Sequence, residues 1–132
     1  MDKPPKKLYK NQTDVWNKAL PVLEQVLKKS DSVKEAYVWA SLAEGKFGLY
    51  EETYQGREGS DVDLVIVMNE PADIPTAWED TTIRKSFFDL YKVGMFTYDG
   101  HKHPIDGLVV FPSRHDLTKM KERLEGRSKQ IK

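Results

Sequence analysis

The spacing of apolar residues predicts an amphipathic helix near the start of the chain. Apolar positions over residues 15–27 recur at steps of three and four, which places them on one helical face. Thr13 or Asp14 is suited to cap the beginning of this helix, and we expect it to end near Lys29. Pro21 lies inside the pattern and predicts a bend or a break, because proline lacks the N–H of a helix interior.

Apolar runs of strand length occur at three further places. The strongest covers residues 62–68 and is almost continuously apolar, which is typical of a central strand covered on both faces. Shorter runs at 36–40 and 105–111 predict two more strands. The segment from 42 to 60 is rich in glycine and glutamate, and we expect a loop there.

The second half of the chain predicts two more helices. Residues 81–93 carry an apolar face at helical spacing, and a short strand over 95–98 should follow before a turn at Asp99 and Gly100. Ser113 is suited to cap a last helix that runs to Leu124.

These elements predict a mixed β-sheet flanked by helices, in the α/β (α+β) class. The order is helix, strand, strand, helix, strand, strand, helix. A chain of 132 residues is the size of one domain, so we expect a single domain over 1–132. The polar segments 1–8 and 126–132 are expected to be flexible.

Composition excludes several functional classes. The chain has no cysteine, which excludes a disulfide scaffold, a thiolate zinc site and a cysteine nucleophile, and agrees with a cytoplasmic location. No apolar stretch is long enough to span a membrane, and the first ten residues lack an apolar signal core. We therefore expect a cytoplasmic protein without a membrane partner.

The 21 basic and 21 acidic residues balance overall but are unevenly distributed. Residues 30–80 hold twelve acidic and only three basic side chains, whereas both ends of the chain are basic. The acidic segment is either a solvated surface or part of an acidic metal site. The positions of individual carboxylates decide between these interpretations.

Asp61 and Asp63 stand where the strongest strand begins. Alternation along a strand points both carboxylates to one side and Val62 to the other. Two adjacent carboxylates repel each other unless a cation lies between them, and oxygen ligands favour Mg²⁺ or Mn²⁺. The alternative is a strand that merely begins with polar residues.

Asp106 is a third candidate, because it is a single carboxylate within an apolar strand. If its strand lies beside that of Asp61 and Asp63, the three carboxylates converge in a way that suits two-metal phosphoryl chemistry. The alternative is a turn residue followed by Gly107.

Three segments together resemble the nucleotidyltransferase superfamily that includes DNA polymerase beta. They read WASLAEG at 39–45, SDVDLVIV at 60–67 and IDGLV at 105–109. The chain is most similar to the minimal, stand-alone prokaryotic members. The resemblance implies a polymerase beta palm-like fold and magnesium-dependent transfer of a nucleoside monophosphate, with AMP from ATP expected, to a hydroxyl of a protein, RNA or small molecule.

The resemblance also implies roles for the acidic residues. Asp61 and Asp63 would ligate both metals. Asp106 would ligate the catalytic metal and help to activate the acceptor hydroxyl. All three are therefore expected to be both catalytic and metal-binding residues.

The expected nucleotide-binding residues are Ala40, Ser41, Ser60, Lys46 and Arg57. Ser41 would hold the triphosphate. Lys46 and Arg57 are candidates to pair with phosphates, and the alternative is that they are surface residues of a flexible loop. Ala40 departs from the family pattern, which has glycine there, and the added methyl group is expected to weaken or abolish catalysis. The loop from Ser41 to Asp61 is longer than is usual in the family and is a candidate lid or recognition element.

Partner expectations follow from the small size. Minimal relatives often accompany a HEPN-type helical protein as the antitoxin of a toxin–antitoxin pair, so the alternative function is a binding module with little or no catalysis. Nucleic acid and a second copy of the chain are further candidate partners.

Two residue sets favour structural roles. His101 and His103 share one strand face, but with no cysteine and no third ligand nearby we interpret them as a surface turn rather than a transition-metal pair. Trp16, Trp39 and Trp78 are interpreted as core residues.

Overall fold

A computed structural model describes residues 3–132, so the first two residues of the expected flexible lead lie outside the described part. The predicted first helix is α1 (Gln12–Leu27). Its cap is Asn11, whose side chain accepts the N–H of Asp14, rather than Thr13 or Asp14. The helix continues through Pro21, because burial of its apolar face outweighs one missing backbone hydrogen bond.

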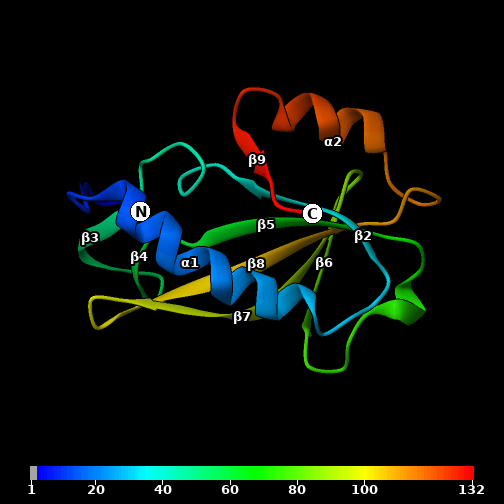
Figure 1. Cartoon of the computed structure of the whole chain (residues 1–132), viewed down its shortest axis with the longest axis horizontal. Helices are drawn as coiled ribbons and strands as arrows, with labels where there is room; N and C mark the ends of the chain where they lie inside the picture. Colours follow the sequence, from blue (N-terminus) through cyan, green and yellow to red (C-terminus); the bar gives the residue numbers. More distant parts are fainter. Residues whose placement is uncertain (1–2) are drawn as a thin grey trace.

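The main sheet has six strands, and their order in space differs from their order in sequence (Figure 1). The strands are, from edge to edge, β6 (Glu79–Arg84), β7 (Asp89–Tyr98), β8 (His101–Val110), β5 (Val62–Met68), β2 (Val33–Trp39) and β9 (Ser128–Gln130). The pair β5–β8 is parallel, and all other neighbours are antiparallel. A mixed sheet of the α+β class is therefore confirmed.

A second, three-stranded sheet occupies segments that we expected to be irregular. It consists of β1 (Lys6–Leu8), β3 (Gly48–Tyr54) and β4 (Arg57–Gly59) in the order β1–β3–β4. The glycines reflect close approach of strands, because a Cβ on Gly48 would lie 2.3 Å from the carbonyl oxygen of Lys7. The expectations of a loop over 42–60 and of a loose lead up to residue 8 were wrong for these strands.

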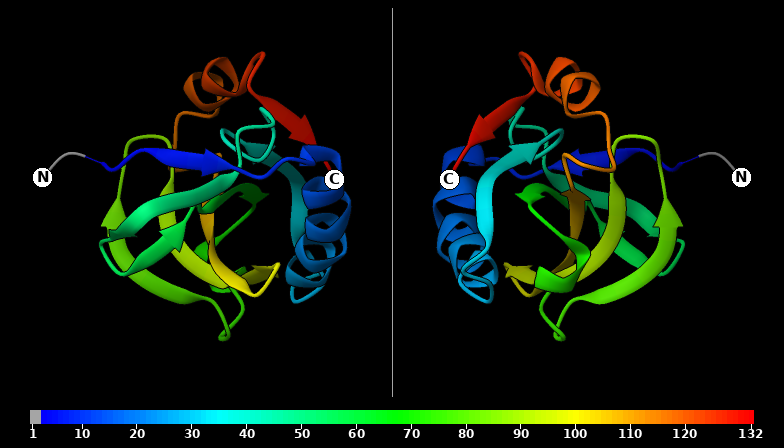
Figure 2. Two further views of the ribbon diagram at one scale, coloured as in Figure 1. Left: turned by 90° about the vertical axis from the view of Figure 1, so that its left-hand side faces the viewer. Right: turned by 90° about the vertical axis from the view of Figure 1, so that its right-hand side faces the viewer.

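The two helices cover opposite faces of the main sheet (Figure 2). Side chains of α1 pack with Leu64 and Ile66 of β5, whereas α2 (Leu117–Leu124) packs with Val65 and Val67. All four of these β5 side chains are essentially inaccessible to solvent. The prediction that residues 62–68 form a central, doubly covered strand is confirmed.

The predicted helix over 81–93 does not exist. This stretch contains β6, a turn and the first half of β7, and the predicted strand at 95–98 is the second half of β7. Tyr91 and Val93 face the α1 side while Leu90 faces the α2 side, so a period of two accounts for the apolar residues. The turn at Asp99 and Gly100 is confirmed, and both residues have positive φ angles of 50° and 78°.

The C-terminal residues are also more ordered than expected. Asp116, not Ser113, caps α2, and its side chain accepts the N–H of Lys119. The expected flexible tail contains β9, which pairs with β2 from Tyr37 to Trp39. A one-turn 3-10 helix, η1 (Pro71–Asp73), follows β5. No helix within residues 3–132 is long and apolar enough to cross a membrane.

Candidate metal and phosphate site

The parallel pairing of β5 and β8 brings the three predicted carboxylates together. Val62 is the register partner of Ile105, and Asp63 is the register partner of Asp106. Register partners in adjacent strands point to the same face, so the Asp63 and Asp106 side chains lie next to each other. The condition that their strands be neighbours, on which the sequence argument depended, is met.

The carboxylates lie on the face of the main sheet that α2 covers, at the end of the strands that α2 does not reach. Asp63 and Asp106 share this face with Val65 and Leu108, which pack under α2 further along the strands. The small sheet, with β3 and β4, lies beside the start of β5, and α2 lies over the other end (Figure 1). The carboxylates are therefore half-buried between the small sheet and α2.

Burial and mutual repulsion disfavour ionisation of two of these groups. Burial, followed by the nearby Asp106 and Asp61 carboxylates, raises the pKa of Asp63 to about 7. Burial and then Asp61 raise the pKa of Asp106 to about 6, although Arg57 and Lys92 act in the opposite direction. Such a cluster is stabilised by a cation that neutralises it.

Arg57 supplies part of that neutralisation. Its guanidinium forms an ion pair with one oxygen of Asp61 and also donates to the side-chain oxygen of Gln55 at 3.1 Å. The second carboxylate oxygen of Asp61 is buried and has no hydrogen-bond partner. A buried, unpartnered carboxylate oxygen beside two further carboxylates is a donor set that suits a hard divalent cation.

The oxygen atoms of the three carboxylates do not form a complete metal-binding site. Within residues 3–132, no group of three or more His, Asp or Glu side chains is placed to hold a metal ion as it stands. Arg57 already occupies one Asp61 oxygen. A divalent ion would therefore have to displace the guanidinium or draw the side chains together.

A cavity of about 270 Å³ adjoins the carboxylates. It is lined by Lys3, Lys6, Ala40, Ser41, Glu44, Lys46, Tyr50, Arg57, Ser60, Asp61, Asp63 and Arg127. Five of these side chains are basic and three are acidic. Asp106 does not line the cavity itself and belongs to the site through its proximity to Asp61 and Asp63.

All five expected nucleotide-binding residues line this cavity. Lys46 is exposed and lies 3.7 Å from Glu44. Ser60 is 2% exposed, and its hydroxyl oxygen accepts the Gly48 N–H at 3.1 Å. Ser60 therefore holds the small sheet to the start of β5, in addition to lining the cavity.

Ala40 adopts a backbone conformation that favours glycine. Its φ angle is 61°, in the left-handed region, where a Cβ costs about 1–2 kcal/mol. Its N–H donates to the carbonyl oxygen of Arg127 at 3.1 Å, so this amide is already used. The position that carries glycine in the resembled family is thus one where glycine fits better here as well.

The sequence arguments missed the contributions of both chain ends. Lys3 and Lys6 reach the cavity from the N-terminal segment, and Arg127 reaches it from the turn before β9. Arg127 donates to Glu44 at 2.8 Å. Only the pairing of β1 with β3 and of β9 with β2 brings these residues to the site, and no local sequence pattern reveals it.

The interpretation of the histidine pair as a surface turn was wrong for His103. Both residues belong to β8, but His103 is fully buried, whereas His101 lies 3.5 Å from Glu58 near the surface. The Nδ1–H of His103 donates to the Ser60 carbonyl at 2.8 Å, and its Nε2 accepts the Tyr9 hydroxyl at 2.8 Å.

The tryptophans differ in burial. Trp78 is a core residue, 4% exposed, as predicted. Trp16 and Trp39 are half-buried at the edges of the two core clusters. Lys129 stacks on Trp16 at 4.6 Å and Arg127 on Trp39 at 5.8 Å.

No protein-family model, curated protein or solved structure matches this chain. The carboxylate register and the basic cavity beside it are therefore the observations from which a function has to be inferred.

Proposed function

We propose that this protein is a magnesium-dependent nucleotidyltransferase that transfers a nucleoside monophosphate, AMP from ATP, to a hydroxyl group and releases pyrophosphate. The observation that carries the proposal is the register pairing of Asp63 with Asp106, with Asp61 beside them and a basic cavity adjoining. The motif resemblance supports the same reaction. The acceptor would be a protein, an RNA or a small molecule.

In this reaction the acceptor oxygen attacks the α-phosphorus of the nucleotide. The bond from that phosphorus to the bridging oxygen breaks, and pyrophosphate leaves with the electron pair. Asp61, Asp63 and Asp106 would hold magnesium, which supplies charge neutralisation at the phosphates and acidifies the acceptor hydroxyl. Manganese has the same ligand preferences and could replace it.

The protein's own residues account for the remaining requirements. Asp106, next to Asp63 on the adjacent strand, would accept the proton of the acceptor hydroxyl. Arg57 and Lys46 lie on the cavity wall, where they would pair with phosphate oxygens. Ser41, also on that wall, would donate to the triphosphate.

A label-transfer assay tests this proposal. The purified protein is incubated with each α-³²P-labelled nucleoside triphosphate, magnesium, and a bacterial extract as a source of protein, RNA and small-molecule acceptors. We expect transfer from ATP that is lost in Asp63→Asn and Asp106→Asn but retained in Glu52→Gln, an exposed acid on β3. Transfer that persists in both carboxylate variants would contradict the proposed active site.

The second candidate is a nucleotide-binding or antitoxin module with little turnover. Two observations favour it: the strained Ala40 and the ion pair between Arg57 and Asp61. Such a module would act by contact with a HEPN-type helical protein, a nucleic acid or a second copy of the chain. Magnesium-dependent ATP binding without label transfer to any acceptor would support this candidate over the enzyme.

A further inference from the structure

Lys6 is a basic residue of the candidate site that comes from the N-terminal strand. It lies on β1 opposite Tyr50 of β3, and its side chain lines the cavity beside the carboxylates. Its Nζ donates to the hydroxyl of Ser60, the residue before Asp61, at 2.9 Å. Lys6 therefore lies next to the carboxylates although it is far from them in the sequence.

The position of Lys6 is fixed from two sides. Pairing of β1 with β3 holds its backbone. Immediately after β1, the Tyr9 hydroxyl donates to buried His103, which in turn donates to the Ser60 carbonyl. The hydroxyl and the carbonyl of Ser60 thus both bind the N-terminal segment, directly or through His103.

Three of the four other basic groups around the cavity are already paired with acids, and the fourth, exposed Lys3, lies over the Tyr50 ring at 5.4 Å. Arg57 pairs with Asp61, Arg127 with Glu44 at 2.8 Å, and Lys46 with Glu44 at 3.7 Å. Within residues 3–132, no carboxylate oxygen lies within 4.0 Å of the Lys6 ammonium, whose resolved contact is the Ser60 hydroxyl. An ammonium has three N–H donors, so two remain for a ligand.

The partial burial of Lys6 increases its value as an anion-binding group. Burial lowers the pKa of its ammonium and Lys3 lowers it further, whereas Asp63 and Asp61 act in the opposite direction. A partly desolvated cation without an ion-pair partner gains more from a phosphate than an exposed lysine does.

We propose that Lys6 is a triphosphate-binding residue of this site, and that it binds the β- or γ-phosphate of the nucleotide. The inference rests on the proposed function. It assigns the N-terminal segment a direct part in substrate binding, and it predicts that the site distinguishes nucleoside triphosphates from monophosphates.

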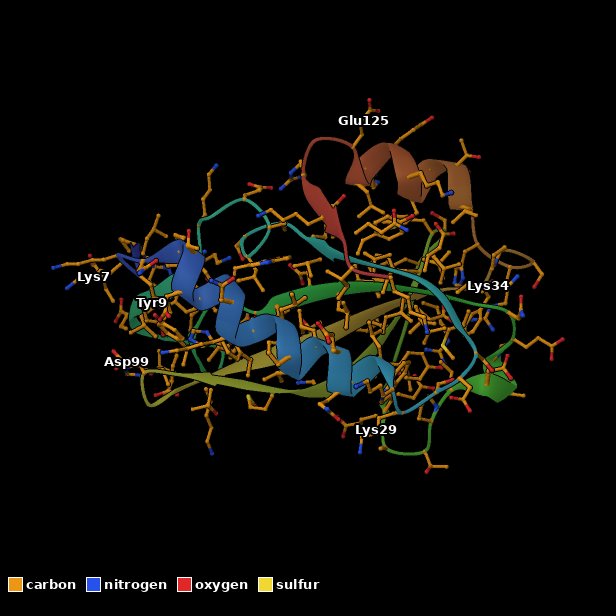
Figure 3. All side chains as sticks on the ribbon, in the orientation of Figure 1. Lys7, Tyr9, Lys29, Lys34, Asp99 and Glu125 are labelled. Carbon is orange, nitrogen blue, oxygen red and sulfur yellow. The ribbon has the colours of Figure 1, made fainter. Side chains whose placement is uncertain are left out.

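The neighbouring lysine provides a matched control. Lys7 is exposed and lines a different cavity, together with Leu49, Tyr98 and Asp99. Figure 3 shows Lys7, Tyr9 and Asp99 at the same end of the molecule, near the start of α1. Lys6→Met and Lys7→Met therefore each remove one positive charge from β1, the first beside the carboxylates and the second at a different cavity.

Calorimetry in magnesium with the non-transferable analogue α,β-methylene ATP, and with AMP, tests the proposal. We expect Lys6→Met to weaken binding of the triphosphate by about ten- to a hundredfold, as for loss of one charge-assisted hydrogen bond. AMP affinity should change by less than about threefold, because the lost contact is to the outer phosphates. Lys7→Met should bind both ligands as the wild type does.

Ser60 keeps its hydrogen bond from Gly48 in Lys6→Met, so the fold should persist, and a melting curve checks this. Lys6→Arg, which keeps the charge, should retain most of the triphosphate affinity. Wild-type affinity in Lys6→Met, combined with loss in Asp63→Asn, would overturn the role of Lys6 and leave the proposed function intact. Failure of the wild type to bind the triphosphate would overturn both.

Discussion

Asp63 of β5 and Asp106 of β8 lie side by side as register partners in the parallel strand pair at the centre of the main sheet. Two half-buried carboxylates in this relationship destabilise each other when both are ionised. The fold nevertheless places them side by side, with the unpartnered oxygen of Asp61 next to them. The divalent cation of the proposed function would offset this cost.

The first prediction concerns the pH dependence of stability without metal. Burial and the neighbouring carboxylates raise the pKa of Asp63 to about 7 in the folded protein, from 3.8. The folded state therefore binds more protons than the unfolded state between these values, and stability falls as pH rises from about 4 to 7. Asp63→Asn removes this titration, so it should be more stable than the wild type at pH 8 by about 1–3 kcal/mol.

Urea unfolding in EDTA at pH 4.5 and pH 8 measures this difference. The two proteins should be nearly equally stable at the lower pH. A constant difference across the pH range, or a destabilised Asp63→Asn at pH 8, would show that Asp63 is not held in a repulsive environment.

The second prediction concerns Ala40, whose φ angle is 61°. Ala40→Gly should raise the free energy of unfolding by up to about 1 kcal/mol, because relief of left-handed strain exceeds the added flexibility of the unfolded chain. Label transfer should be preserved or increased. Ala43→Gly, at a position without a positive φ angle, should instead lower stability. Loss of transfer in Ala40→Gly would mean that the methyl group is required.

The third prediction concerns the contact between α1 and the segment before β3. The Gln12 side chain donates to the Phe47 carbonyl at 2.8 Å and accepts the Phe47 N–H at 3.0 Å. It also donates to the Tyr9 carbonyl at 2.7 Å. Gln12→Ala should lower the free energy of unfolding by about 2 kcal/mol, whereas exposed Thr13→Ala should change it little. Equal effects of the two substitutions would contradict this role.

The fourth prediction concerns the buried carboxylate of Asp89 at the far end of the sheet. Asp89 is 1% exposed, accepts the Nε2–H of His115 at 2.9 Å and pairs with Arg114. Asp89→Ala should lower the free energy of unfolding by about 2–3 kcal/mol, because it leaves the buried Nε2–H of His115 without a partner and removes the ion pair with half-exposed Arg114. Asp80 provides the control, because it is exposed and pairs with Arg84, which lies 3.6 Å from Asp89 as well. A larger loss in Asp80→Ala than in Asp89→Ala would refute this assignment.

The parts of the fold that could be predicted from sequence are those whose pattern of apolar residues fits one kind of element best. Apart from Asp63, residues 62–68 are apolar on both faces, which is typical of a central strand covered on both sides. Residues 81–93 also contain apolar side chains at intervals that fit a helix, but pairing with β8 decides in favour of strands. The small sheet was missed because its glycines allow close strand contact, which local sequence does not distinguish from a loop.

The residues of the candidate site also differ in how far local sequence predicts them. Asp61, Asp63 and Asp106 carry a local signal, since a carboxylate beside or within an apolar strand is costly to bury unless it is paired or bound to a cation. Lys6, Arg127 and the buried His103 carry none, because their places depend on strand pairings between distant segments. Sequence reasoning therefore identified the acidic half of the site and only part of the basic half.

The most direct test of the central claim is a Mn²⁺ titration followed by electron paramagnetic resonance. The account predicts that the wild type binds Mn²⁺, that Asp61→Asn and Asp63→Asn each weaken binding at least about tenfold, and that Glu52→Gln does not. At a hundredfold excess over the dissociation constant, Mn²⁺ should add about 2.7 kcal/mol to wild-type stability. Absence of binding, or equal affinity in the wild type and both aspartate variants, would contradict the account.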